Sequence, residues 1–143
     1  MTIVIQLITS FIASAAFGIL FHVQLRSLIQ CGTVGMLGWA VYYLMTDAGY
    51  DALGATLAAA FLVTFASQIC AKVFKTPIIV FSVSGIIPLV PGALAYDAMR
   101  SLAEGDYSLM AQFAGRAFML SGAIAIGLLF SEVTNQLVKK TGR

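Results

Sequence analysis

The stretch TPIIVFSVSGIIPLVPGALAYDAMR, which runs from Thr76 to Arg100, decides the fold. It is long and apolar enough to cross a bilayer. Near its middle, however, it carries two glycines and two prolines: Gly85, Pro88, Pro91 and Gly92. A proline inside a helix has no N–H for the carbonyl four residues earlier, so these prolines free the carbonyls of Ser84 and Ile87. The residue before each proline also resists helical geometry. We therefore predict a helix break here.

The helix is expected to restart at Pro91, because proline suits the first turn of a helix. A restart there leaves the N–H groups of Gly92, Ala93 and Leu94 without internal acceptors. In hydrocarbon each such group costs several kcal/mol unless protein, water or ligand satisfies it. The break therefore predicts a polar, lined cavity. The alternative is a proline kink whose free groups are satisfied by neighbouring Ser or Thr hydroxyls.

Composition places the whole chain in a lipid bilayer. Of its 143 residues 60% are hydrophobic and 10% are charged, and the mean hydropathy is +0.96. A soluble domain carries about a quarter charged residues. The net charge of +2 provides no basic stripe for nucleic acid. Cys31 and Cys70 lack metal-ligand spacing, and no catalytic Ser/His or paired-Asp constellation appears, so we expect no metal, no cofactor and no enzymatic activity.

Hydropathy predicts an all-α polytopic membrane protein with about five transmembrane helices. We expect a single transmembrane domain over residues 1–143, with crossings at 3–21, 28–45, 52–71, 77–99 and 109–130, the fourth interrupted by Pro and Gly. Small and polar residues recur every fourth position in two crossings: Gln6, Ser10, Ser14 and Gly18 in the first, and Thr56, Ala60, Thr64 and Gln68 in the third. Such faces favour helix packing over substrate contact.

Basic residues predict the orientation in a plasma (inner) membrane, because Lys and Arg near helix ends are retained in the cytoplasm. In a count of five helices Arg100 alone falls on one side, and six bases fall on the other: Arg26, Lys72, Lys75, Lys139, Lys140 and Arg143. We therefore expect the N-terminus outside and the C-terminus in the cytoplasm.

Two charged residues fall inside apolar segments. Arg116 lies in the first half of the last crossing, and Asp97 lies at a comparable depth in an antiparallel hairpin. An intramembrane arginine usually faces protein or water and has a partner. Two interpretations stay open: an Asp97–Arg116 pair that borders a substrate path, or Asp97 bonded to Arg100 while Arg116 reaches toward the interface.

Several of these segments resemble a known family. The run GIIPLVPGALAYDAM, the segment FHVQLR and the glycine-rich helix after it resemble the smaller membrane subunit of split threonine/serine exporters, and equally the C-terminal membrane half of fused exporters. The most specific part is IPLVPG, residues 87–92. The resemblance implies proton-driven export of threonine, serine or related small carboxylates. It also implies a larger homologous membrane subunit, with a cytoplasmic domain, as partner.

Together these observations give a hypothesis for substrate binding. The N–H groups of residues 92–94 hold a carboxylate, and the carbonyl of Ser84 or Ile87 accepts from an ammonium group, as at other interrupted transporter helices. The predicted substrate-binding residues are Ser84, Gly85, Pro88, Pro91, Gly92, Asp97 and Arg116. Alternatives are a dicarboxylate (succinate-like) exporter that uses Arg116 as a second positive group, an accessory subunit that binds no substrate, and a channel. Homo-oligomer formation also stays open.

Overall fold

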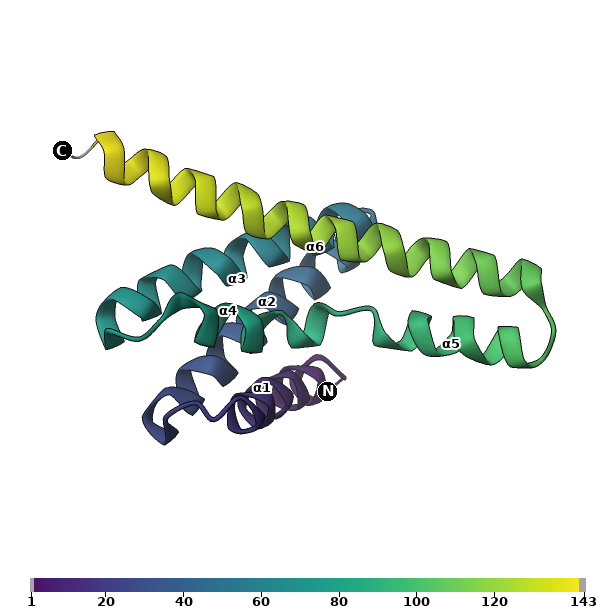
Figure 1. Ribbon diagram of the computed structural model, residues 1–143, viewed down its shortest axis with the longest axis horizontal. Coiled ribbons are helices and arrows are strands. Elements are labelled where there is room, and N and C mark those ends of the chain that lie inside the picture. Colours follow the sequence, from purple (N-terminus) through teal and green to yellow (C-terminus); the bar gives the residue numbers. More distant parts are fainter. Residues whose placement is uncertain (1, 142–143) are drawn as a thin grey trace.

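The computed structural model describes residues 2–141, and helices make up its regular structure, with no strand in that range (Figure 1). The elements in chain order are α1 (Thr2–Leu20), the 3-10 turn η1 (Leu25–Ser27), α2 (Leu28–Asp47), α3 (Ala52–Phe74), α4 (Ile78–Ile86), the 3-10 turn η2 (Ile87–Leu89), α5 (Gly92–Ala103) and α6 (Tyr107–Thr141). Four spans, formed by α1, α2 with η1, α3 and α6, are long and apolar enough to cross a membrane. The α4–η2 segment and α5 form a further candidate span, bent by 54°. The predicted all-α membrane fold with an interrupted fourth span is confirmed.

The last helix is longer than the crossing expected from hydropathy. Helix α6 has 35 residues and continues to Thr141, whereas the apolar run ends near Phe130. Between these two points the sequence contains Glu, Gln, Leu and Lys, which are good helix formers, and no glycine or proline. Main-chain hydrogen bonding therefore continues where hydropathy falls. Helix α3 likewise extends to Phe74 and ends where Lys75 adopts a left-handed conformation, with φ of 51°.

The small-residue faces of α1 and α3 pack against protein, as expected. The buried residues of α1 are Ser10, Ser14 and Gly18. Helix α3 buries its own fourfold series, Thr56, Ala60, Thr64 and Gln68. Helices α1 and α2 approach closely where Ser14 faces Gly35, because a Cβ on that glycine would overlap the serine Oγ. The missing side chain sets this helix crossing.

The interrupted segment is anchored in the protein core. One buried apolar cluster joins α2, α3, η2 and α6, and its members are Val34, Ala59, Ala60, Val63, Leu89 and Ile124. Leu89 comes from the break itself and is only 7% exposed. One turn earlier, a Cβ on Gly85 would lie 2.7 Å from Val34 and 2.8 Å from Val63. The first side of the break is therefore held against α2 and α3.

The second side of the break is less enclosed. Helix α5 packs along the first half of α6, and this hairpin extends beyond the other helices on the right of Figure 1. Ala98 and Ser101 are buried between the two helices. Large side chains on both helices remain open, including Tyr96 at 68%, Met99 at 67% and Phe118 at 82% exposure. The hairpin thus presents apolar surface that this chain does not cover.

Gly127 provides a test of how α6 is seated on α3. A Cβ there would lie 2.7 Å from the Leu57 carbonyl oxygen, a main-chain atom that cannot move aside cheaply. We expect Gly127→Leu to lower the free energy of unfolding by about 2 kcal/mol or more, as overpacking does. Gly122→Leu on the same helix is the control, since no atom lies within 4 Å of its Cβ position. Thermal unfolding in detergent measures both variants, and equal melting temperatures would contradict this seating.

Candidate functional site

The break lies between the end of α4 at Ile86 and the start of α5 at Gly92. One 3-10 turn, η2, follows α4; Val90 is then extended, with φ of −63° and ψ of 127°. Pro91 comes next with φ of −77° and ψ of 54°. These dihedral angles end one helix and start another at a different angle. Each proline sits where a continuous helix would need its N–H, as expected. The expected restart at Pro91 is corrected by one residue, because the ψ angle of Pro91 is not helical and Gly92 is the first residue of α5.

Two of the polar main-chain groups expected to be free are in fact satisfied. The N–H of Val90 donates to the Ile87 carbonyl at 3.3 Å, so that carbonyl is not free. The N–H of Gly92 donates to the Val90 carbonyl at 2.8 Å. This bond closes an inverse γ-turn centred on Pro91, whose dihedral angles suit it. The expectations for the Ile87 carbonyl and the Gly92 N–H are therefore corrected.

Three other main-chain groups lack a helical partner, as predicted: the N–H groups of Ala93 and Leu94 and the carbonyl of Ser84. The first bond of α5 runs from the Ala95 N–H to the Pro91 carbonyl at 3.1 Å. Within residues 2–141 the N–H groups of Ala93 and Leu94 have no acceptor. The Ser84 carbonyl has no α-helical donor, because Pro88 has no N–H. The Ser84 hydroxyl is used within α4 and donates to the Val80 carbonyl at 2.9 Å. The break thus offers two donors and one acceptor.

One pocket opens beside the break on the side of α1 and α2. It has a volume of about 250 Å³ and is lined by Gln6, Thr9, Ser10, Ala13, Trp39 and Pro88. The Trp39 indole N–H donates to Gln6 Oε1 at 3.3 Å, which ties α2 to α1 across the pocket. The Thr9 hydroxyl donates to main-chain carbonyls of its own helix. Gln6 and Ser10 are the other polar residues that α1 brings to this pocket, which Pro88 also lines. We call this the α1–α2 pocket.

A second pocket lies on the other side of the break, between α3 and α6. It has a volume of about 340 Å³, and its lining residues are Tyr42, Asp51, Ala52, Leu53, Leu94, Arg116, Met119 and Leu120. Leu94 carries one of the free N–H groups of α5. Arg116 and Asp51 bring opposite charges to the same pocket, and the Asp51 carboxylate also accepts from the Leu53 N–H at 3.3 Å to cap α3. We call this the α3–α6 pocket.

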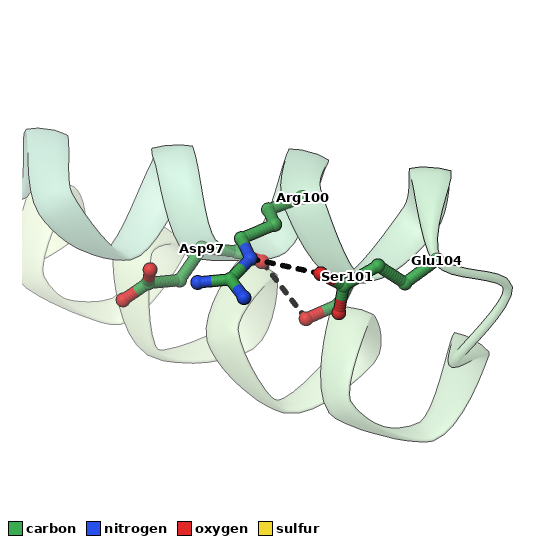
Figure 2. A network of polar contacts seen from close by, with 4 residues as sticks. All are labelled: Asp97, Arg100, Ser101 and Glu104. Atoms are coloured by element: carbon green, nitrogen blue, oxygen red, sulfur yellow. Dashed lines mark hydrogen bonds and ion pairs between the residues drawn. The ribbon is translucent and has the colours of Figure 1, made fainter.

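Of the two interpretations of Asp97 and Arg116, the ion pair between them does not form. Within residues 2–140, whose side chains are described, the one ion pair joins Arg100 Nε to Glu104 Oε1 at 2.9 Å. Figure 2 shows the Arg100 guanidinium between Asp97 and Glu104, with the bond made to Glu104. The Asp97 carbonyl accepts from the Ser101 hydroxyl at 2.9 Å. The alternative bond from Asp97 to Arg100 is not formed either, and Arg116 instead shares its pocket with Asp51.

The structure distributes the remaining predicted site residues around the break. Ser84 and Gly85 are buried, and the Gly85 carbonyl faces α2, 3.6 Å from the Cβ position of Gly35. Pro88 lines the α1–α2 pocket. Gly92 is exposed, with no atom within 4 Å of its Cβ position. Ser84 and Gly85 therefore face the protein interior, whereas Gly92 borders open space.

The pocket residues that sequence reasoning missed include Gln6, Trp39, Tyr42 and Asp51. Gln6 was assigned to a packing face, the two aromatic residues lie near the end of the second crossing, and Asp51 directly precedes the third. The Gln6 position in a small-residue face was a signal of a bond to a neighbouring helix, because amide side chains hydrogen-bond across helices. The other three come together only through the helix crossings.

A family model described as "Threonine/Serine exporter, ThrE" matches residues 6–134. The chain belongs to the threonine/serine exporter family. The family match includes the break and the lining residues of both pockets, from Gln6 to Leu120. No solved structure matches the chain. The predicted family is thus confirmed, and the chain is a multi-pass membrane protein of an exporter family.

Proposed function

We propose that this exporter-family chain carries a small zwitterionic amino acid, threonine or serine, past the break between α4 and α5. The observation that carries the proposal is the pair of free N–H groups on Ala93 and Leu94 at the start of α5, beside Arg116. The N-terminus of a helix favours a negative charge, and Arg can bind a carboxylate with two parallel hydrogen bonds. These groups would hold the substrate carboxylate.

The ammonium group of the substrate has an acceptor in the same pocket. The carboxylate of Asp51 lines the α3–α6 pocket opposite in charge to Arg116. Ser84, whose carbonyl lacks an α-helical donor, is fully buried and lines neither pocket, so Asp51 is the proposed acceptor. A pocket with one Arg and one Asp matches a zwitterion in charge. A dicarboxylate would place its second carboxylate near Asp51, where like charges repel. The charges therefore favour an amino acid over a succinate-like substrate.

A larger homologous membrane subunit is part of the proposal. The exposed apolar face of the α5–α6 hairpin supports it, because transporters of this kind are commonly built from two related halves around a central site. Proton coupling is proposed from the family alone. We also propose that the C-terminus faces the cytoplasm, since the basic residues cluster at that end; the side on which a C-terminal reporter is active would test this.

Replacement of Arg116 tests the proposed carboxylate contact. We expect Arg116→Leu to weaken export of threonine about tenfold or more, because a hydrogen bond to a charged group contributes about 1.5–3 kcal/mol. Arg100→Leu is the matched control: its ion pair with Glu104 is exposed and contributes little. Export of threonine, serine and succinate from cells or vesicles that contain the complete transporter measures the effect. Full threonine export by the Arg116 variant would remove this residue from the site, and preferred export of succinate by the unmodified protein would overturn the zwitterion assignment.

A further inference from the structure

A third cavity lies apart from the break, where α3 ends and α4 begins beside α6. Its volume is about 220 Å³, and it is lined by Ala71 and Ile78 and by five polar or charged residues: Gln68, Lys72, Glu132, Asn135 and Lys139. The Gln68 amide is fixed, since its Nε2 donates to the Ser131 carbonyl at 3.2 Å and the residue is only 5% exposed. This bond joins α3 to α6 at the cavity. We call this space the lysine cavity.

The two lysines of this cavity are not held in ion pairs within the described part of the chain. Neither Lys72 nor Lys139 forms an ion pair with any residue between 2 and 140. Glu132 lines the same cavity and accepts from Gln136 Nε2 at 3.3 Å. Two positive charges and one negative charge leave a net charge of +1. A ligand that carries a single negative charge would neutralise the cavity, whereas a zwitterion of net charge zero would not.

The surroundings of the cavity are those of a membrane boundary. Lys72 lies in the last turn of α3, which ends at Phe74. Large apolar side chains that lie within two residues of the lining residues in sequence are exposed: Val73 at 67%, Ile79 at 62%, Phe130 at 60% and Val133 at 51%. A molecule with a charged head and hydrocarbon chains could place its head between the lysines and its chains along these side chains. A water-soluble anion would make no use of them.

We propose that the lysine cavity binds the headgroup of an anionic phospholipid of the phosphatidylglycerol type. The phosphodiester lies between the ammonium groups of Lys72 and Lys139, and Asn135 and Glu132 are placed to bond the hydroxyl groups of the glycerol. Basic pockets between transmembrane helices bind anionic headgroups in this manner. The bound lipid holds the end of α3 to α6 beside the bond between Gln68 and Ser131. The proposal is independent of the substrate and of the site at the break.

Thermal unfolding of the purified full chain in detergent tests this proposal. Addition of phosphatidylglycerol should raise the melting temperature by about 4 °C or more, because a ligand that binds only the folded state stabilises it. Phosphatidylethanolamine and threonine should give smaller shifts. Lys72→Gln with Lys139→Gln should abolish the shift caused by phosphatidylglycerol. Lys75→Gln with Lys140→Gln removes the same charge from residues outside the cavity and should retain it.

Four results would overturn the proposal. Equal loss of the shift in both double variants would mean general attraction to a basic surface. If phosphatidylethanolamine raised the melting temperature as much as phosphatidylglycerol, the net charge of the lipid would not matter. If threonine raised the melting temperature of the unmodified protein but not of the Lys72 and Lys139 double variant, the cavity would be a substrate site. If that double variant does not fold, the single variants Lys72→Gln and Lys139→Gln replace it, and each should reduce the shift. An undiminished shift in both would equally contradict the proposal.

Discussion

Gly92→Leu should reduce amino-acid export by about ten- to a hundredfold while the protein still reaches the membrane. Gly92 opens α5 directly after the break, and the space around its Cβ position is empty of protein atoms. A leucine there displaces no part of the chain but occupies the approach to the free N–H groups of Ala93 and Leu94. Loss of a charge-assisted bond to the substrate carboxylate costs about 1.5–3 kcal/mol, which sets the expected range.

The control for this variant is Gly122→Leu. Its Cβ position on α6 is equally empty, and Gly122 lines neither pocket at the break. Both variants lose the same glycine flexibility and gain the same side chain within a helix. Initial rates of threonine export, normalised to the amount of each variant in the membrane, give the comparison. If both variants export like the unmodified protein, the start of α5 does not contact substrate.

Replacement of both Pro88 and Pro91 by alanine should also reduce export by more than about tenfold, but for a different reason. Alanine restores an N–H to both positions and has the highest helix propensity, whereas proline costs about 3 kcal/mol inside a helix. The chain from α4 to α5 is then free to form a continuous helix. In that helix the N–H groups of Ala93 and Leu94 donate to carbonyls four residues earlier and no longer face a ligand.

Stability separates this effect from simple misfolding. The double variant should unfold at the same temperature as the unmodified protein or higher, since a broken helix is replaced by an intact one. Pro77→Ala is the matched control, because Pro77 precedes the first turn of α4 and interrupts no helix; its export should be unchanged. Normal export by the Pro88 and Pro91 variant would show that transport does not need the break.

The break was predictable because its causes are local. Missing N–H groups and the restricted dihedral angles of proline act within a few residues, so Pro88 and Pro91 in sequence are enough to expect it. The inverse γ-turn was not predictable from the sequence. It depends on the ψ angle of Pro91, and a proline ring fixes φ but not ψ. That turn satisfies the Gly92 N–H and leaves Ala93 and Leu94 as the free donors.

The pockets were less predictable because they depend on how helices are rotated about their axes. Distance along a hairpin placed Asp97 and Arg116 at similar depth, but depth does not say which way each side chain faces. Arg116 lines a pocket with Asp51 from the start of α3, a neighbour that no spacing along the sequence indicates. Gln6 was placed on a packing face, and the same face of α1 also lines a pocket, which the spacing of small residues does not indicate.

The central claim is that the start of α5 faces water inside the membrane, and thiol labelling tests it most directly. In a chain with Cys31→Ala and Cys70→Ala, a single cysteine is placed at Leu94, which lines the α3–α6 pocket, or at Leu62, which is exposed on the middle of α3. A charged, membrane-impermeant thiol reagent needs the thiolate, which forms poorly in an apolar environment. The account predicts that the cysteine at 94 reacts at least about tenfold faster than the one at 62 and is protected by threonine. Equal, slow labelling at both positions would contradict it.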